Sequence, residues 1–266
     1  MSPDEVVVLL MSTMVALTTW GMWVRQPITF PARAELGRPT GVLRLAPLVS
    51  AIVLFVILKT LSSFDVQDSP IYLTFYMVMG AAWVGLATQL TPLAGVSRRD
   101  DVLERRNPAA AVALAGAILG ITLSFAGGNI GDGPGWWVVV FSAAIATGTL
   151  YLTWLAHDNL TGVGDVVTVE RDLAAGVRLA GFLVATGMIL GRAVAGDWVS
   201  VPATLRDFVV AAWPVLVLLG VAVLVERMAR PSPERPALPV GTYGFLPALA
   251  YEIATVLYIA SIGIET

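Results

Sequence analysis

Three ionisable residues, Glu252, Arg178 and Arg44, lie inside long apolar segments, where a charged side chain is costly and marks a candidate functional site. Glu252 lies about eight residues, or roughly 12 Å, into its segment. An ionised carboxylate at that depth has to be paired, in contact with water, or protonated. Arg178 and Arg44 enter their own segments from the same side, so we expect a buried Glu252–Arg178 pair, with Arg44 nearby, lining a polar cavity. A purely structural ion pair, or arginines that extend back to the membrane interface, would give the same pattern.

Other residue types with chemical potential are few. His157 and Asp158 could relay protons, but their place at the end of an apolar run favours a water-exposed helix end. The glycine-rich stretch 127–135 lacks the Lys-Ser/Thr ending and the preceding strand of a phosphate-binding loop, so it predicts a turn. The chain has no cysteine and one histidine, which excludes thiolate and multi-histidine metal sites. We therefore expect no metal, no cofactor and no enzyme activity.

The composition is that of an all-α integral membrane protein. Of the 266 residues, 57% are hydrophobic and only 13% are charged, whereas soluble domains are about 25% charged. Apolar runs of about 20 residues, the length that spans roughly 30 Å of hydrocarbon, recur along the chain. They predict eight transmembrane helices, over 5–24, 44–62, 70–92, 108–126, 136–156, 173–194, 208–226 and 244–262. Pro214 predicts a kink in the seventh.

The cationic residues are distributed unevenly between the two sides of the predicted bundle. Four alternate loops carry twelve arginines, whereas the opposite side has three cations, Lys59, Arg192 and Arg206. Because cytoplasmic loops collect Lys and Arg, the arginine-rich loops are predicted to face inward and both termini outward. Trp20, Trp23 and Trp154 would then be anchors at the inner interface. The net charge of −3 gives no reason to expect nucleic acid binding.

A signature led by glutamate recurs before alternate helices. The four glutamates are spaced 69, 66 and 64 residues apart: Glu35, Glu104, Glu170 and Glu234. The spacing predicts four parallel two-helix hairpin repeats in one membrane domain, at approximately 1–66, 67–134, 135–200 and 201–266.

The two middle copies correspond best, because 107–116 reads NPAAAVALAG and 172–181 reads DLAAGVRLAG. Asn107 and Asp172 are residue types that cap helix N-termini, so the signature is interpreted as a capping and anchoring motif. The alternative is an inner-surface docking ring for a cytoplasmic partner.

Small residues four positions apart predict close helix packing in the returning helices. Gly116 and Gly120 form one GxxxG pattern, and Gly187 and Gly191 form another. In lipid, such patterns allow helix backbones to approach each other closely. We expect packing within one chain rather than a dimer face.

The segments 92–120 and 170–181 resemble the bacterial membrane family called domain of unknown function 350, and the resemblance extends over residues 75–195. It implies a multi-pass protein of the bacterial inner membrane built from two-helix hairpins, with no settled activity. Some family members lie beside genes for envelope-stress proteins. This chain is about twice the usual size, and Leu173 replaces a proline of the pattern.

These features favour a non-enzymatic membrane scaffold or accessory subunit, in envelope stress or homeostasis, whose arginine-rich inner loops bind a cytoplasmic or membrane partner. The alternative is a channel or transporter for protons, cations or small cationic solutes, centred on Glu252. A lipid or quinone bound between helices is a third option, and the chain could form a homo-oligomer.

Overall fold

The computed structural model describes residues 1–29, 40–230 and 239–263, and within these ranges the chain forms helices and no strand. The long helices are α1 (Pro3–Thr29), α2 (Thr40–Thr60), α4 (Pro70–Thr88), α5 (Pro108–Gly127), α6 (Trp136–Thr161), α8 (Leu173–Ala193), α9 (Val201–Ala212), α10 (Pro214–Met228) and α11 (Leu246–Ile262). Short helical turns lie between them: α3 (Phe64–Asp68), η2 (Thr91–Ala94), η3 (Arg98–Glu104), α7 (Val163–Thr168) and η4 (Gly241–Phe245).

Eight helical segments of the described chain are long and apolar enough to cross a membrane, which confirms the predicted number. The largest difference is in the seventh, which runs from Val201 to Met228 instead of 208–226. Its helix is interrupted at Trp213, where α9 ends and α10 begins with Pro214. Proline has no backbone N–H to donate and its ring clashes with the preceding turn, so the interruption lies next to the residue that predicts a break, while Trp213 itself keeps helical dihedral angles.

Local sequence sets the helix starts. Asn107 precedes Pro108, and its side-chain oxygen accepts hydrogen bonds from the amides of Ala109 and Ala110 at 2.9 and 3.2 Å. Asp172 caps α8 in the same way, accepting from the amide of Ala174 at 2.9 Å. A capping oxygen satisfies amides that have no partner within the helix.

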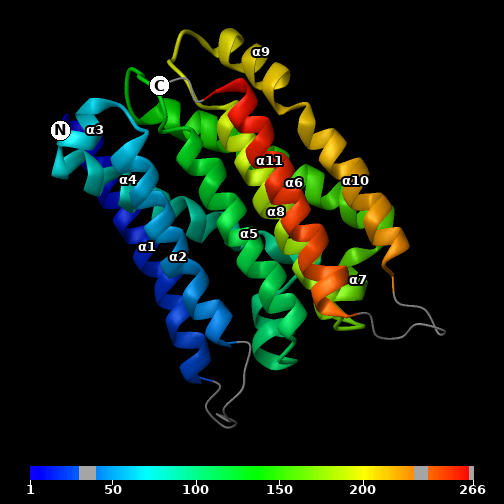
Figure 1. Cartoon of the computed structure of the whole chain (residues 1–266). Helices are drawn as coiled ribbons and strands as arrows, with labels where there is room; N and C mark the ends of the chain where they lie inside the picture. The colour runs from blue at the N-terminus through cyan, green and yellow to red at the C-terminus, as the bar shows by residue number, and fades with distance from the viewer. Residues whose placement is uncertain (30–39, 231–238, 264–266) are drawn as a thin grey trace.

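The helices form two rows, and the central pair, α5 and α8, belongs to one of them. Helices α5 and α8 are the most enclosed, with 78% of each span buried, compared with 11% for α1 and 17% for α11. Along one row α2 packs on α5, α5 on α8, and α8 on α11 (Figure 1). Along the other, α1 packs on α4 and α6 on α10.

Glycines bring the backbones of the central pair together. A Cβ atom added at Gly187 of α8 would lie 2.5 Å from the Cα atom of Gly120 on α5. One added at Gly116 would lie 2.6 Å from the Cβ atom of Ala180, and one at Gly191 would lie 2.5 Å from the carbonyl oxygen of Leu123. All four glycines of the two GxxxG patterns therefore lie in the α5–α8 contact within one chain.

The start of α1 and the end of α11 lie at the same end of the bundle (Figure 1). The opposite end carries η3, α7 and the C-terminal end of α10, with Arg99, Arg105, Arg171 and Arg227. We call it the arginine-rich end.

Candidate functional site

Arg178 and Glu226 form a buried ion pair between α8 and α10. The guanidinium Nε and Nη2 donate to the two carboxylate oxygens of Glu226 at 2.7 and 2.6 Å. Its Nη1 donates to the backbone carbonyl oxygen of Tyr243 in η4 at 2.6 Å. The side chains are 1% and 2% exposed. Three helical elements are thus joined at one arginine whose three guanidinium nitrogens all donate, an arrangement that lowers the cost of burying both charges.

The predicted pairing of Arg178 with Glu252 is therefore wrong. Arg178 bonds to Tyr243, which places the guanidinium level with the turn η4 at the start of α11. Glu252 lies seven residues beyond Phe245, the last residue of that turn, or roughly 10 Å further along the helix axis. The two residues lie at different depths, and an arginine side chain has a nearer carboxylate in Glu226.

The sequence analysis missed Glu226. This residue stands beside Arg227 in the last turn of an apolar run, where a charged residue is easily assigned to the following loop. The similar depth of Arg178 and Glu226 in the predicted bundle is the signal that could have identified this pair. Arg178 lies five residues inside α8 and Glu226 two residues inside the end of α10, so both are close to the arginine-rich end.

Glu252 is half-buried, near the middle of the span from Gly241 to Ile262. It forms no hydrogen bond or ion pair with any residue that the structure describes. Its neighbours Leu249, Ile253 and Val256 are 54%, 50% and 50% exposed, so the carboxyl group borders the outward, apolar face of α11.

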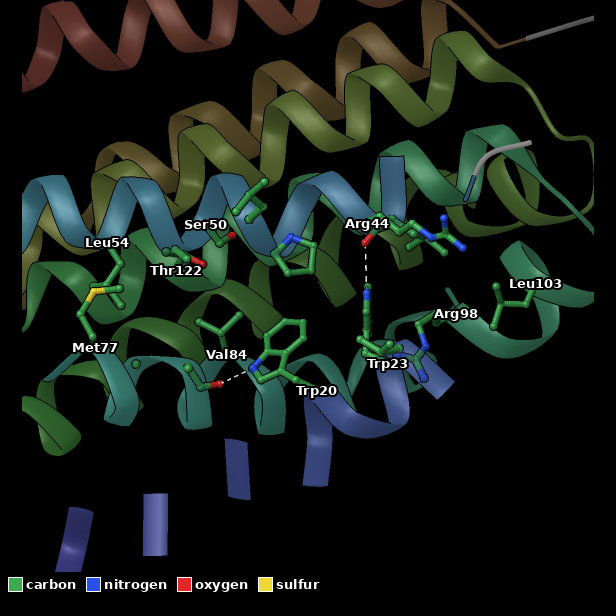
Figure 2. Close-up of a pocket in the computed structure, with 17 residues that line it drawn as sticks. Trp20, Trp23, Arg44, Ser50, Leu54, Met77, Val84, Arg98, Leu103 and Thr122 are labelled. Atoms are coloured by element: carbon green, nitrogen blue, oxygen red, sulfur yellow. Dashed lines mark hydrogen bonds between the residues drawn. The ribbon is translucent and has the colours of Figure 1, made fainter. Parts of the chain in front are cut away.

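Arg44 does not join the Arg178–Glu226 pair. It lies on α2 and lines a cavity of about 590 Å³ between α1, α2 and α4, together with Arg98 of η3 (Figure 2). Trp20 and Trp23 line the same cavity, and each indole N–H donates to a backbone carbonyl, that of Ala81 at 2.9 Å and that of Leu43 at 3.0 Å. Trp23 is 7% exposed, so it is a packing element and not the predicted interface anchor, whereas Trp20 is partly buried on the side where α1 packs on α4.

Two more expectations at the arginine-rich end are corrected. Trp154 is fully buried and stacks on Tyr151, with ring centroids 5.9 Å apart, so it is a core residue and not an anchor. His157 is 1% exposed, and its ring lies 4.7 Å from that of Phe182, so it is not at a wet helix end. The reason is that α6 continues past His157 to Thr161 and packs against α7, α8 and α10.

The repeat signature lies at the arginine-rich end in its two described copies. Glu104 pairs with Arg99 at 3.2 Å, and Glu170 lies 3.9 Å from Arg230, both at the surface. Glu35 and Glu234 lie outside the described residues. The side-chain amide of Asn107 also donates to the carbonyl oxygen of Val167 at 2.7 Å, which joins the two copies.

The backbone of the two described copies follows the same path. Arg106 and Arg171, which precede the capping residues, both adopt left-handed conformations, with φ of 56° and 58°. The amide of Asn107 donates to the carbonyl oxygen of Asp101 at 3.0 Å, and the amide of Asp172 to that of Val166 at 3.1 Å. The two turns therefore share a wide backbone loop as well as a cap.

No group of three or more His, Asp or Glu side chains in the described ranges is placed to hold a metal ion. Comparisons of the chain with family models, curated proteins and solved structures give no match.

Proposed function

We propose that the chain is a non-enzymatic, multi-pass protein of the bacterial inner membrane that acts as a scaffold or accessory subunit for a membrane partner. The observation that carries this proposal is the contrast between two acids within the apolar helices, Glu226 and Glu252. Both carboxylate oxygens of Glu226 accept hydrogen bonds inside the bundle, whereas Glu252 borders the outward face of α11 without a partner among the described residues. An unpartnered carboxyl group at membrane depth favours a neighbour that brings a hydrogen-bond donor.

The proposed architecture is four tandem two-helix units. Hydrogen bonds that join residues about one repeat apart support it, with separations of 64 or 65 residues: Trp83 to Thr147, Tyr151 to Ala87, Asp132 to Asp197, and Arg178 to Tyr243. These separations match the spacing of the glutamate signatures, as expected when each unit packs on the next. The unusually close α5–α8 contact would then be the interface between the two middle units.

The proposed partner is a transmembrane helix that places a cationic or hydrogen-bonding side chain against Glu252. Leu249, Ile253 and Val256 would pack against its apolar face. The arginine-rich loops, with the surface pair of Arg99 and Glu104, would offer a second contact to its cytoplasmic part.

Photo-crosslinking in native membranes tests this proposal. A crosslinking amino acid replaces Val256, one turn from Glu252, and in the control it replaces Leu216, which is 68% exposed on α10. We expect one discrete protein adduct from position 256, lost in Glu252→Leu and absent from position 216. An adduct containing only a second copy of the chain would replace the accessory role by a homo-oligomer, and adducts of equal yield at both positions would contradict the proposal.

Transport of protons or cations centred on Glu252 is the second candidate, because an ionisable group without a partner at this depth is also the residue that a proton relay needs. Purified protein in liposomes with an imposed proton gradient tests it. Transport predicts flux that is lost in Glu252→Gln and kept in the control Asp207→Gln, whereas the accessory role predicts no flux in either protein.

A further inference from the structure

The cavity between α1, α2 and α4 has an apolar wall. Its volume of about 590 Å³ lies within the range of roughly 300–1,000 Å³ typical of small-molecule sites. Leu43, Pro47, Leu54, Met77, Val84 and Leu103 contribute to the lining (Figure 2). Apolar cavities exclude water and accept apolar occupants, so this wall is suited to a hydrocarbon chain.

The cavity opens toward the surrounding bilayer. Val24 of α1 and Leu48 of α2 belong to its lining, yet they are 63% and 57% exposed. Helix α1 packs on α4, and α2 packs on α4 and α5. A molecule that enters between α1 and α2 would therefore come from the membrane itself.

Two cations line the arginine-rich end of the cavity, Arg44 from α2 and Arg98 from η3 (Figure 2). The guanidinium carbon of Arg98 lies 4.1 Å from the centroid of the Trp23 ring, a cation–π contact. Since the Trp23 indole is held by its hydrogen bond to Leu43, Arg98 is held in place as well. Two arginines beside an apolar chamber match a molecule with an anionic head and an apolar tail.

The deeper part of the cavity offers a ligand little polar surface. Thr122, in the lining, bonds to the carbonyl oxygen of Ile118 at 2.7 Å, as hydroxyls inside helices usually do. Ser50 lies six residues beyond Arg44, roughly 9 Å deeper along α2, and its hydroxyl oxygen is buried. Beyond the two arginines the lining therefore suits a hydrocarbon chain.

We propose that this cavity binds one acyl chain of an anionic phospholipid from the surrounding membrane. The lipid phosphate lies at Arg44 and Arg98, and the acyl chain fills the space between the helices. The site is separate from the partner face at Glu252, so either proposal stands without the other.

Native mass spectrometry of delipidated, purified protein tests the site, with phosphatidylglycerol and phosphatidylcholine of identical chains as probes. We expect the wild-type chain to retain phosphatidylglycerol at least tenfold more than phosphatidylcholine. The double variant Arg44→Gln/Arg98→Gln should lose this preference. Arg99→Gln is the matched control, because Arg99 is the neighbour of Arg98, is 65% exposed and does not line the cavity.

A second pair of variants tests the tail site without changing charge. Ala51→Phe places a ring in the cavity and should abolish retention of phosphatidylglycerol, whereas Ile52→Phe, on the outward face next to it, should leave retention unchanged. Thermal unfolding of each variant in detergent shows that it is folded. Equal retention of the two lipids by the wild-type chain, unchanged retention in Ala51→Phe, or full displacement of the lipid by millimolar inorganic phosphate would each overturn the proposal.

Discussion

Arg178 of α8 and Glu226 of α10 are joined by two parallel hydrogen bonds of 2.7 and 2.6 Å, and neither side chain is more than 2% exposed. With the third bond to the Tyr243 carbonyl, this pair ties the returning helix of the third proposed unit to both helices of the fourth. Loss of one partner would leave a charge buried without compensation, and that cost is large.

Arg178→Met should therefore destabilise the chain by about 3–5 kcal/mol, seen as a large fall in the thermal midpoint in detergent. The double variant Arg178→Met/Glu226→Leu should recover most of the loss, because no isolated charge remains. Asp207→Asn is the control, since its pair with Arg206 is exposed and should contribute little. Additive effects of the two single substitutions would show that the pair is not coupled.

The α5–α8 contact predicts opposite effects of adding a methyl group to two helical glycines. Gly187→Ala should cost about 1–3 kcal/mol, because the new Cβ atom would meet the Gly120 backbone and the helices would have to separate. Gly148→Ala in α6 should be neutral or stabilising, since nothing lies within 4 Å of the added atom. Thermal unfolding of both variants in one detergent measures the difference, and equal midpoints would show that the close contact does not matter for stability.

The two caps should differ in strength although they occupy equivalent positions. Asn107 accepts from two amides and also donates to the Val167 carbonyl, whereas Asp172 accepts from one amide. A cap contributes about 1 kcal/mol, so Asp172→Ala should cost about that much and Asn107→Ala more.

Asn107→Ser separates the two contributions of this residue, because the serine hydroxyl can still cap the helix but is too short to reach the Val167 carbonyl. It should fall between wild type and Asn107→Ala in a denaturation series. An Asn107→Ser variant as unstable as Asn107→Ala would assign the whole effect to the bond between the two copies.

The sequence predicts well how deep a residue lies along its helix in the membrane, but poorly which neighbouring helix its side chain faces. Hydropathy and the prolines at 70 and 108 located the spans and their starts, because these depend on local composition and on backbone hydrogen bonding. The partner of Arg178 depends on which faces of α8, α10 and α11 meet, and each of these helices is apolar on several sides. Periodicity therefore could not distinguish Glu226 from Glu252.

The same limit explains Trp20, Trp23 and Trp154. Their positions near span ends are typical of interface anchors, yet all three side chains face neighbouring helices. Their orientation depends on packing partners that lie far along the chain. The GxxxG patterns were more informative, because glycine at four-residue spacing on two helices favours close backbone approach.

The orientation of the chain in the membrane can be measured directly, because the natural sequence has no cysteine and needs no background substitutions. A single cysteine at Arg99 or Arg230, at the arginine-rich end, should react with a membrane-impermeant maleimide only after the inner membrane is opened. A cysteine at Asp132 or Gly133, at the opposite end, should react in intact spheroplasts. The reverse pattern would contradict the predicted placement of both termini outside.

The headgroup end of the proposed lipid site should respond to alkaline pH through Arg98. Burial lowers the pKa of Arg98 to about 10, so this guanidinium is still cationic at neutral pH and loses its charge as the pH rises through 10. A phosphodiester headgroup stays anionic over the same range. Retention of phosphatidylglycerol should therefore be constant between pH 6 and 8.5 and fall above pH 9.5. In Arg98→Gln it should start lower and show no such fall, whereas a fall of equal size in that variant would assign the pH dependence to another group.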